Sequence, residues 1–281
     1  MKTINDIGGL RAKVEYWRRG GNVAFVPTMG NLHAGHLSLV REARKIADRV
    51  VASIFVNPLQ FGAGEDFENY PRTLELDAGM LEGEGTDLLF APPVELMYPK
   101  PASEQTLVKV PGISELLCGA HRPGHFVGVA TVVCKLFNMV QPDIALFGKK
   151  DLQQLMVIRR MVEDLAMPVR VVGIDTYRES DGLAMSSRNG YLEPEERAMA
   201  PVLYRVLSGL AEKLRQGNED YAGLQSQAVR ELDEKGFRTD YVAIRRAEDL
   251  LEPAPDEANL VVLIAAYLGK ARLIDNIEVS R

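Results

Sequence analysis

The sequence has few cysteines and no long hydrophobic run. Its 281 residues include two cysteines, Cys118 and Cys134, and no Cys-x-x-Cys pair. Two thiols cannot make a disulfide framework, so this usage favours a reducing compartment. The longest apolar run covers residues 260–268, which is strand-sized and far short of the roughly 18 residues of a membrane span. Because residues 1–21 also lack the apolar stretch of a signal peptide, we expect a cytoplasmic protein with no membrane partner.

The chain also lacks an excess of positive charge. Lysine and arginine total 33 against 39 aspartates and glutamates, so the formal net charge is −6. Nucleic-acid binding calls for clustered basic residues, so we expect no nucleic-acid partner, while a local basic pocket stays open. Hydrophobic residues make up 46% and charged residues 26% of the chain. These values are near the average of globular proteins and exclude a largely disordered chain.

The first part of the chain alternates β-branched runs with longer amphipathic segments. A buried strand is predicted over residues 22–27, a helix over 34–48 and a second strand over 50–56. Such a βαβ unit makes a parallel sheet. The alternation continues with helices over 74–83, 127–140 and 152–165 and strands over 87–91, 143–147 and 169–174. The pattern predicts an α/β fold, with a Rossmann-like parallel sheet and helices on both faces.

The pattern changes after about residue 176. Charged amphipathic helices are predicted over residues 195–216 and 221–235. Three strands with short connections follow, over 241–245, 260–267 and 272–278. This succession is typical of an α+β domain. We therefore predict two domains, a Rossmann-like domain over residues 1–176 and a smaller α+β domain over 177–281.

The first predicted strand is followed by a turn with two histidines, Pro-Thr-Met-Gly-Asn-Leu-His-Ala-Gly-His over residues 27–36. Ligands of open parallel sheets bind at the carboxyl ends of the strands, and glycine lets the backbone come close to them. His33 and His36 share the first turn of the next helix, whose unpaired N–H groups attract anions. Each imidazole can donate to a developing negative oxygen, so the pattern predicts a phosphate site. A structural turn with capping or core histidines is the alternative.

Zinc binding is a second interpretation of the histidines. The chain has four, in the pairs His33/His36 and His121/His125. A catalytic zinc site usually adds a third protein ligand, and neither a His-Glu-x-x-His motif nor suitably spaced cysteines occur. The sequence therefore favours phosphate binding over zinc.

Amide side chains follow the second predicted strand. Asn57 and Gln60 can bind hydroxyls and carboxylates without being ionised. Their place at a strand's carboxyl end favours substrate contact over an ordinary polar loop. Asp77, on the next predicted helix, is either a solvated surface acid or a residue with a metal or ribose role.

Two later loops carry groups that suit phosphate. Residues 148–154 are Gly-Lys-Lys-Asp-Leu-Gln-Gln, in which a lysine at a helix start puts positive charge beside free N–H groups. One of these lysines can point to solvent, and Gln154 can face the cleft from one turn into the helix. Residues 185–189 are Met-Ser-Ser-Arg-Asn, whose hydroxyls and guanidinium suit terminal phosphates. That motif alone also fits an ordinary helix-entry loop.

Together these segments resemble the pantothenate synthetase (pantoate–β-alanine ligase) family. His-Ala-Gly-His matches the HxGH signature of the wider nucleotidyltransferase superfamily, and Met-Ser-Ser-Arg-Asn is similar to its KMSKS-type loop. The segments FVNPLQF, YPRT and KDLQQL, in this order, are specific to the ligase family. The chain departs from the family at Lys149, where an acidic residue is more usual, and at Leu76, where some relatives carry a second acid.

The resemblance implies that the protein ligates pantoate and β-alanine to pantothenate, a precursor of coenzyme A. The pantoate carboxylate attacks the α-phosphate of ATP, giving pantoyl adenylate and pyrophosphate, and the β-alanine amine then displaces AMP. Positioning and electrostatics dominate such a reaction. The resemblance also implies a homodimer and Mg²⁺ between phosphate oxygens, with Asp77 as a candidate for supporting the ion.

Site residues follow from the same resemblance. His33, His36 and Lys150 are expected to be catalytic, with His36 also a candidate proton donor. ATP is expected to contact Met29, Gly30, Asn31, Leu32, His33, Ala34, Gly35, His36, Gly148, Lys149, Lys150, Asp151, Tyr177, Met185, Ser186, Ser187 and Arg188. Pantoate is expected to contact Gln60, Gln154, Asn57 and Tyr70, with Gln60 also near β-alanine. Residues 1–176 are then the ATP- and pantoate-binding catalytic domain, and residues 177–281 close over the active site.

Two other functions remain open at this point. An adenylyltransferase that makes a dinucleotide also carries HxGH, but it does not form AMP. A nucleotide-binding regulator would bind ATP without releasing pyrophosphate, and it would have no need of a pair of substrate-binding glutamines.

Overall fold

The computed structural model describes residues 1–62 and 64–281. They divide into two compact units. The first unit comprises residues 1–115, 122–149 and 153–175. The second comprises residues 116–121, 150–152 and 176–281, so two short segments from the first part of the sequence belong with it.

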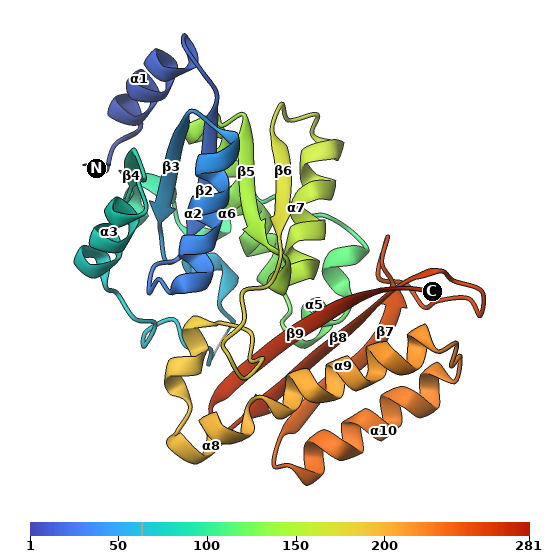
Figure 1. Ribbon diagram of the computed structural model, residues 1–281. Helices are drawn as coiled ribbons and strands as arrows, with labels where there is room; N and C mark the ends of the chain where they lie inside the picture. The colour runs from blue at the N-terminus through green and yellow to red at the C-terminus, as the bar shows by residue number, and fades with distance from the viewer. Residues whose placement is uncertain (63) are drawn as a thin grey trace. The chain divides into compact units, whose positions relative to one another are not determined.

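A parallel sheet forms the centre of the first unit (Figure 1). In the part of the chain described, its strands are β1 (Lys2–Ile4), β2 (Val23–Thr28), β3 (Arg49–Ile54), β4 (Leu88–Phe90), β5 (Ile144–Gly148) and β6 (Arg170–Ile174). The order across the sheet is β1-β4-β3-β2-β5-β6, and every neighbouring pair is parallel. The predicted strands are confirmed to within two residues at each end; only the three-residue β1 was not predicted.

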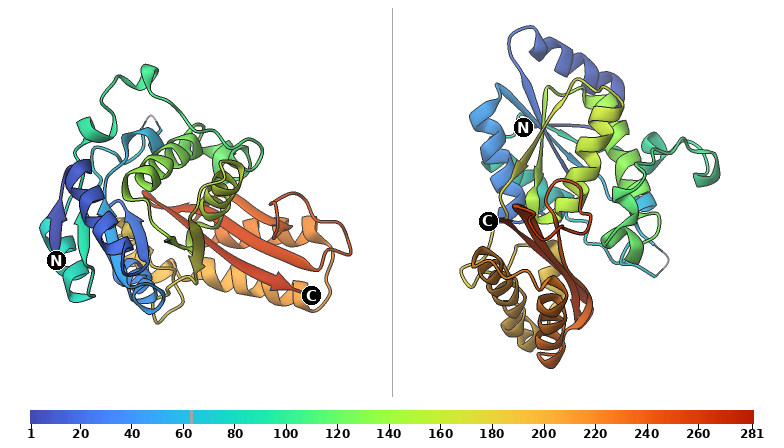
Figure 2. Two further views of the ribbon diagram at one scale, coloured as in Figure 1. Left: turned by 90° about the horizontal axis from the view of Figure 1, so that it is seen from above. Right: turned by 90° about the vertical axis from the view of Figure 1, so that its right-hand side faces the viewer.

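Helices cover both faces of this sheet, as predicted. They are α1 (Ile7–Arg18), α2 (Ala34–Ile46), α3 (Leu74–Gly83), α4 (Val94–Met97), α6 (His125–Val140) and α7 (Leu152–Asp164). On one face, Val40 of α2 packs in a buried cluster with Val26 and Leu146 of the sheet. On the other, Phe137 of α6 meets Phe25 of β2 edge to face, with ring centroids 6.4 Å apart. The right-hand view of Figure 2 shows α2, in blue, and α6, in green, on opposite sides of the sheet.

The strand order reverses between β2 and β5. From β2 the chain moves outward through β3 to β4, and it then returns so that β5 pairs with the other side of β2. Ligands of open parallel sheets bind at such a switch point, outside the carboxyl ends of the strands. The loops that follow β2, β3 and β5 leave from this edge, and they carry the histidine, amide and lysine motifs.

The second unit is an antiparallel sheet with two long helices packed on it (Figure 1). Its strands, in order, are β7 (Arg238–Arg246), β8 (Asn259–Leu268) and β9 (Ala271–Ser280). The helices are α5 (Cys118–His121), α8 (Pro194–Met199), α9 (Val202–Arg215) and α10 (Tyr221–Glu234). Apolar side chains of α9 and α10, such as Leu207 and Leu232, fill the core together with Val262 and Ile264 of β8.

The prediction of one continuous helix over residues 195–216 was wrong. The structure has α8 and α9 instead, separated at Ala200 and Pro201. Proline has no N–H to continue the helix, and its ring clashes with the preceding turn, so a new helix starts after it. The charged amphipathic pattern runs through this break, which is why periodicity alone did not reveal it.

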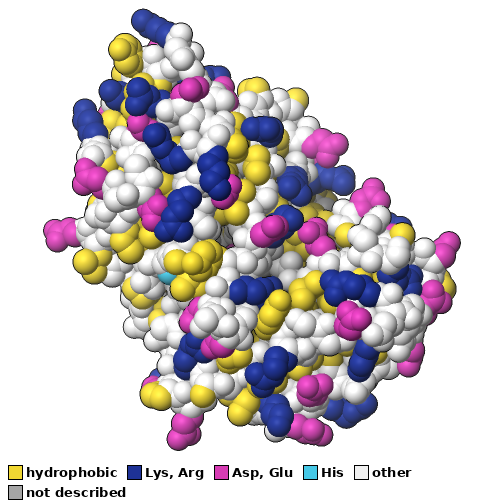
Figure 3. All heavy atoms as spheres, in the orientation of Figure 1, with side chains coloured by type: hydrophobic (Ala, Val, Ile, Leu, Met, Phe, Trp, Pro, Cys, Tyr) yellow, Lys and Arg dark blue, Asp and Glu magenta, His cyan; other side chains and the backbone are white. Residues whose placement is uncertain are grey.

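The outer surface shows no separation of charges on the face drawn in Figure 3, where basic and acidic side chains are interspersed. Among the helices of residues 1–62 and 64–281, none combines the length and the apolar character that crossing a bilayer requires.

Candidate active site

The N-terminus of α2 is capped by its own two histidines. His33 is the N-cap residue, and its Nδ1 accepts a hydrogen bond from the Gly35 N–H at 3.1 Å. Nδ1 of His36, three residues later, accepts from the His33 N–H at 3.3 Å. The two rings lie with their centroids 4.1 Å apart. The capping alternative is therefore confirmed, and the capping bonds are made to Nδ1 of each ring.

This capping sets where the proton sits on each imidazole. A ring nitrogen that accepts a hydrogen bond carries no proton, so both rings carry their proton on Nε2. Neutral imidazoles fit a helix N-terminus, where the macrodipole disfavours a cation. His33 and His36 thus each have an Nε2–H that can donate to an anion. This geometry favours hydrogen-bond donation by His36, and proton transfer from it stays a prediction.

A buried carboxylate anchors the turn between β2 and α2. Oδ2 and Oδ1 of Asp77, on α3, accept the N–H groups of Asn31 and Leu32, both at 2.9 Å. Gly30 and Asn31 have left-handed φ angles of 82° and 49°. Glycine adopts this conformation readily, whereas at Asn31 it is uncommon and gains from outside support. Asp77 is fully buried, so its interpretation as a solvated surface acid was wrong. A role in supporting Mg²⁺ stays a prediction.

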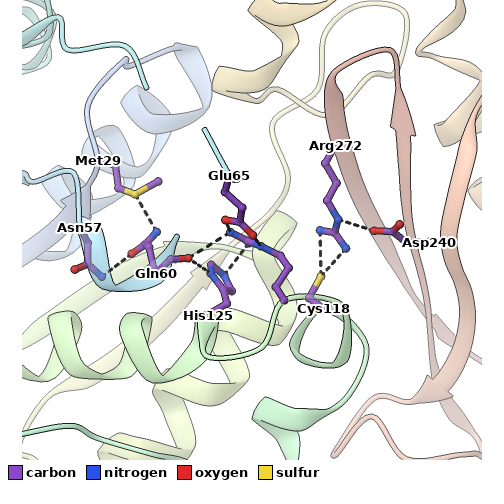
Figure 4. A network of polar contacts seen from close by, with 9 residues as sticks. Met29, Asn57, Gln60, Glu65, Cys118, His125, Asp240 and Arg272 are labelled. Atoms are coloured by element: carbon purple, nitrogen blue, oxygen red, sulfur yellow. Dashed lines mark hydrogen bonds and ion pairs between the residues drawn. The ribbon is translucent and has the colours of Figure 1, made fainter. Parts of the chain in front are cut away.

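The side chain of Gln60 is held in place by two neighbours (Figure 4). Gln60 ends the 3₁₀ helix η1 (Pro58–Gln60). Its Oε1 accepts from Asn57 Nδ2 at 3.0 Å, and its Nε2 lies 2.9 Å from Sδ of Met29. The Met29 contact connects the amide loop to the loop that leads into α2. The structure therefore brings Met29, Asn57 and Gln60 together, as the sequence predicted for the edge of the sheet.

Asn57 is a part of the framework of this loop. It is 1% exposed, and its amide also donates to the Gly128 carbonyl at 3.1 Å and accepts from Tyr98 Oη at 2.7 Å. Burial raises the pKa of Tyr98, so this hydroxyl stays protonated and remains a donor. These contacts favour orientation of Gln60 as the role of Asn57, and its direct contact with a substrate stays a prediction. Tyr70, another predicted substrate contact, is buried against the ring of Phe61.

The loop after β5 holds the predicted lysines and glutamine. Within the first unit, Lys149 Nζ pairs with Oδ1 of the exposed Asp175 at 2.8 Å. Gln153 is buried and donates to the Ile113 carbonyl at 2.8 Å. Gln154 is half-buried on α7, which makes it the better candidate of the two for a substrate.

The second unit brings Lys150 and Ser186 together in one small pocket. Its polar lining consists of Lys150, Ser186, Asn189 and Asp275. Ser186 caps the 3₁₀ helix η5 (Ser187–Tyr191) by accepting the Arg188 N–H at 3.2 Å. The predicted Ser-Ser-Arg segment therefore forms a helix start, where backbone N–H groups suit anions. Tyr177, at the beginning of this loop, is 42% exposed.

Two residues of β9 that the sequence did not reveal support this pocket. Asp275 is buried and binds Arg178 through both carboxylate oxygens, at 2.5 and 2.9 Å, while Arg178 also donates to the Gly182 carbonyl. Asn276 donates to the Lys150 carbonyl at 2.9 Å. The only signal in the sequence is an Asp-Asn pair inside an otherwise largely apolar strand.

No group of three or more His, Cys, Asp or Glu side chains suited to a metal ion occurs among the residues described. His125 lies in the first unit and His121 in the second. Zinc binding by the histidine pairs stays untested.

Comparison with known proteins agrees with this architecture. Residues 2–278 match the family model described as pantoate-beta-alanine ligase. The chain belongs to this family. It is 56% identical, over 286 aligned residues, to the pantothenate synthetase of Colwellia psychrerythraea, covering 100% of this chain and 99% of that protein. The family resemblance based on the ligase-specific motifs of the sequence is therefore confirmed.

Solved structures agree as well. The crystal structure of pantothenate synthetase from Thermus thermophilus is 52% identical and superimposes with a TM-score of 0.92, covering 100% of both chains. A pantoate-beta-alanine ligase from Francisella tularensis, complexed with beta-gamma ATP and beta-alanine, is 31% identical with a TM-score of 0.82, covering 99% of this chain and 97% of that one. The similarity extends through both units.

Proposed function

We propose that the protein forms pantothenate from pantoate and β-alanine, with ATP as the activating substrate. One observation carries the proposal beyond family membership. Two Nε2–H donors stand at the N-terminus of α2, and the oriented amide of Gln60 is connected to the same loop through Met29. A donor pair for a phosphate beside an amide for a carboxylate or hydroxyl is the arrangement that adenylation of pantoate requires.

In the first step the pantoate carboxylate attacks the α-phosphate, and pyrophosphate leaves. Negative charge on the α-phosphate oxygens is stabilised by His33, His36 and the N-terminus of α2. Lys150 and the segment 186–188 bind the departing phosphates. Met185, Tyr177, Gly148 and Asp151 are the remaining proposed nucleotide contacts outside the 29–36 loop. The proposed scheme includes no covalent bond between the chain and a substrate, so substrate positioning and electrostatics account for the rate of adenylation.

In the second step the β-alanine amine attacks the acyl carbon of the bound adenylate. The C–N bond forms, the acyl–phosphate bond breaks, the amine loses a proton and AMP leaves. Gln60 and Gln154 hold the pantoyl group, with Gln60 beside the entering β-alanine. Mg²⁺ between phosphate oxygens, Asp77 as its support, and a homodimer are further predictions from the family resemblance.

Omitting β-alanine tests the two-step scheme. ATP and pantoate alone should release up to one pyrophosphate per site and leave pantoyl adenylate bound. Adding β-alanine should then yield AMP and pantothenate. Pyrophosphate release that strictly requires β-alanine would contradict the scheme. A dinucleotide product would identify the adenylyltransferase alternative, and ATP binding without pyrophosphate would identify the regulator.

Alanine in place of Gln60 or Gln154 should weaken pantoate binding selectively. An unpaired buried polar group of the substrate costs roughly 1–3 kcal/mol, which is about tenfold to a hundredfold in affinity. ATP affinity should change little, because the proposed phosphate donors lie on other loops. Separate titrations with ATP and pantoate measure this, with the surface variant Gln216→Ala as the control. Equal weakening for both ligands would mean that the glutamines support the cleft rather than pantoate.

A further inference from the structure

We propose that Glu65, Arg122 and His125 form a clamp that positions the main chain of Gln60 for substrate binding. This inference rests on the proposed role of Gln60, and it assigns a positioning function to three residues that do not themselves need to touch a substrate. All of them lie in the first unit.

The clamp converges on one carbonyl group (Figure 4). Nδ1 of His125, at the start of α6, lies 2.8 Å from the Gln60 carbonyl oxygen. Arg122 Nη2 donates to the same oxygen at 3.4 Å, and Arg122 Nη1 lies 3.0 Å from His125 Nε2. Glu65 holds the guanidinium by accepting hydrogen bonds from Arg122 Nε and Nη2, at 2.8 and 2.6 Å.

The hydrogen-bond partners define the protonation of His125. A carbonyl oxygen only accepts, so Nδ1 must carry the proton that reaches Gln60. A guanidinium only donates, so Nε2 must accept from Arg122. His125 is therefore neutral and protonated on Nδ1, whereas the capping histidines His33 and His36 are protonated on Nε2.

Charge and burial hold the side chains of the clamp together. The Arg122 side chain is 16% exposed, and such a charge needs a partner. Burial by itself raises the pKa of Glu65, but the hydrogen bonds and the charge of Arg122 outweigh it and hold the pKa below its usual range. Glu65 is therefore ionised at neutral pH and balances the guanidinium, which is free to donate to His125 and Gln60.

The loop at Gln60 needs this support. The 3₁₀ helix η1 has weak internal bonds, with the Gln60 N–H donating to the Asn57 carbonyl at 3.4 Å. Gly128 lets η1 lie directly against α6, since a Cβ there would be 2.2 Å from the Leu59 carbonyl oxygen. The side chain of Gln60 is set by Asn57 and Met29, and the clamp sets its backbone. Together these contacts fix both the side chain and the main chain of Gln60.

Substituting His125 tests the clamp, because the KM for pantoate should change while the KM for ATP should not. When adenylation is measured as pyrophosphate release, His125→Ala should raise the KM for pantoate about tenfold. This is the effect expected from the loss of one buried hydrogen bond. The KM for ATP should stay within about twofold of wild type. His125→Asn should restore much of the pantoate KM, because Nδ2 of asparagine replaces Nδ1 as the donor to Gln60.

Glu65 provides a second variant and a matched control. Glu65→Gln removes the charge that holds Arg122 and should raise the pantoate KM in the same direction as His125→Ala. Glu68→Gln, an exposed acid on the same segment, should leave it unchanged. Equal increases in both Michaelis constants, or no change in His125→Ala, would overturn the clamp.

The tautomer of His125 is a readout that needs no substrate. In the folded, ligand-free protein, ¹⁵N NMR should show the proton of His125 on Nδ1, and His125→Asn identifies the signal by removing it. A proton on Nε2 would overturn the clamp even if the enzyme were active. Conversely, absence of pyrophosphate release by the wild-type protein with the Nδ1 tautomer present would refute the proposed function and leave the clamp geometry standing.

Discussion

Alanine in place of His36 or Lys150 is expected to lower the rate of adenylation by roughly 100–1,000-fold, the typical cost of losing one preorganised donor to a developing oxyanion. His36 contributes an Nε2–H at the N-terminus of α2. Lys150, which lines the same pocket as Ser186, contributes an ammonium group that lies 3.8 Å from Asp151 Oδ1. In the proposed mechanism, both groups act on phosphate charge that grows during the reaction. The measurement is pyrophosphate release from ATP and pantoate, with circular dichroism to confirm the fold.

A second substitution separates catalysis by His36 from capping. In His36→Asn, Oδ1 takes the position of Nδ1 and still accepts the His33 N–H, while the Nε2–H donor is lost. The variant should therefore keep wild-type stability and still lose most of the activity. If it lost stability but kept activity, the histidine would be a cap alone.

Lys235 is the matched control for Lys150. It is an exposed lysine of the same unit, so Lys235→Ala should change adenylation little. Asn276 donates a hydrogen bond to the main-chain carbonyl of Lys150. This contact does not depend on the lysine side chain and should remain in Lys150→Ala. Near-normal rates in both His36→Ala and Lys150→Ala would show that the phosphate assignment is wrong.

The central strands of the first unit's sheet could be predicted because they are buried on both faces. Parallel strands such as β2 and β3 are then continuous apolar runs, which stand out between amphipathic helices. β1 was missed because its sequence, Lys-Thr-Ile, has one apolar residue and is no apolar run, whereas the equally short β4 is Leu-Leu-Phe. The break between α8 and α9 was missed because the periodicity persists across Pro201.

The motif loops of the site could be predicted as well, because the switch point of a parallel sheet assigns ligands to the ends of particular strands. The supporting residues could not. Arg122 is 62 residues from Gln60 in sequence, and Arg178 is 97 residues from Asp275. Such pairs follow from tertiary packing, and neither residue carries a local signal for its partner.

The role of Asp77 could not be predicted from the sequence for the same reason. Its position on a helix was predicted correctly, yet the sequence left open whether it was solvated or functional. The deciding contact is with a turn 45 and 46 residues earlier, at Leu32 and Asn31. Buried in the structure, it supports the loop that the HxGH motif belongs to.

Asp77→Ala is therefore expected to have a large effect on both stability and ATP binding. The change leaves the N–H groups of Asn31 and Leu32 without their acceptor, at roughly 1–3 kcal/mol each if they stay buried. We expect a loss of about 3 kcal/mol in the free energy of unfolding, because water entering the vacated space offsets part of the cost. Chemical denaturation measures it. The turn with φ angles of 82° and 49° at Gly30 and Asn31 then lacks its anchor, so ATP affinity should fall as well.

Two controls decide how Asp77 acts. Glu75→Ala changes an exposed acid on the same helix and should leave stability and ATP affinity unchanged. Asp77→Asn keeps one acceptor oxygen, so it should lose less stability than Asp77→Ala. Raising the Mg²⁺ concentration separates the anchoring role from metal support. If Asp77 only anchors the turn, excess Mg²⁺ restores no ATP affinity to the asparagine variant, whereas recovery of affinity with Mg²⁺ would show that the carboxylate supports the metal ion.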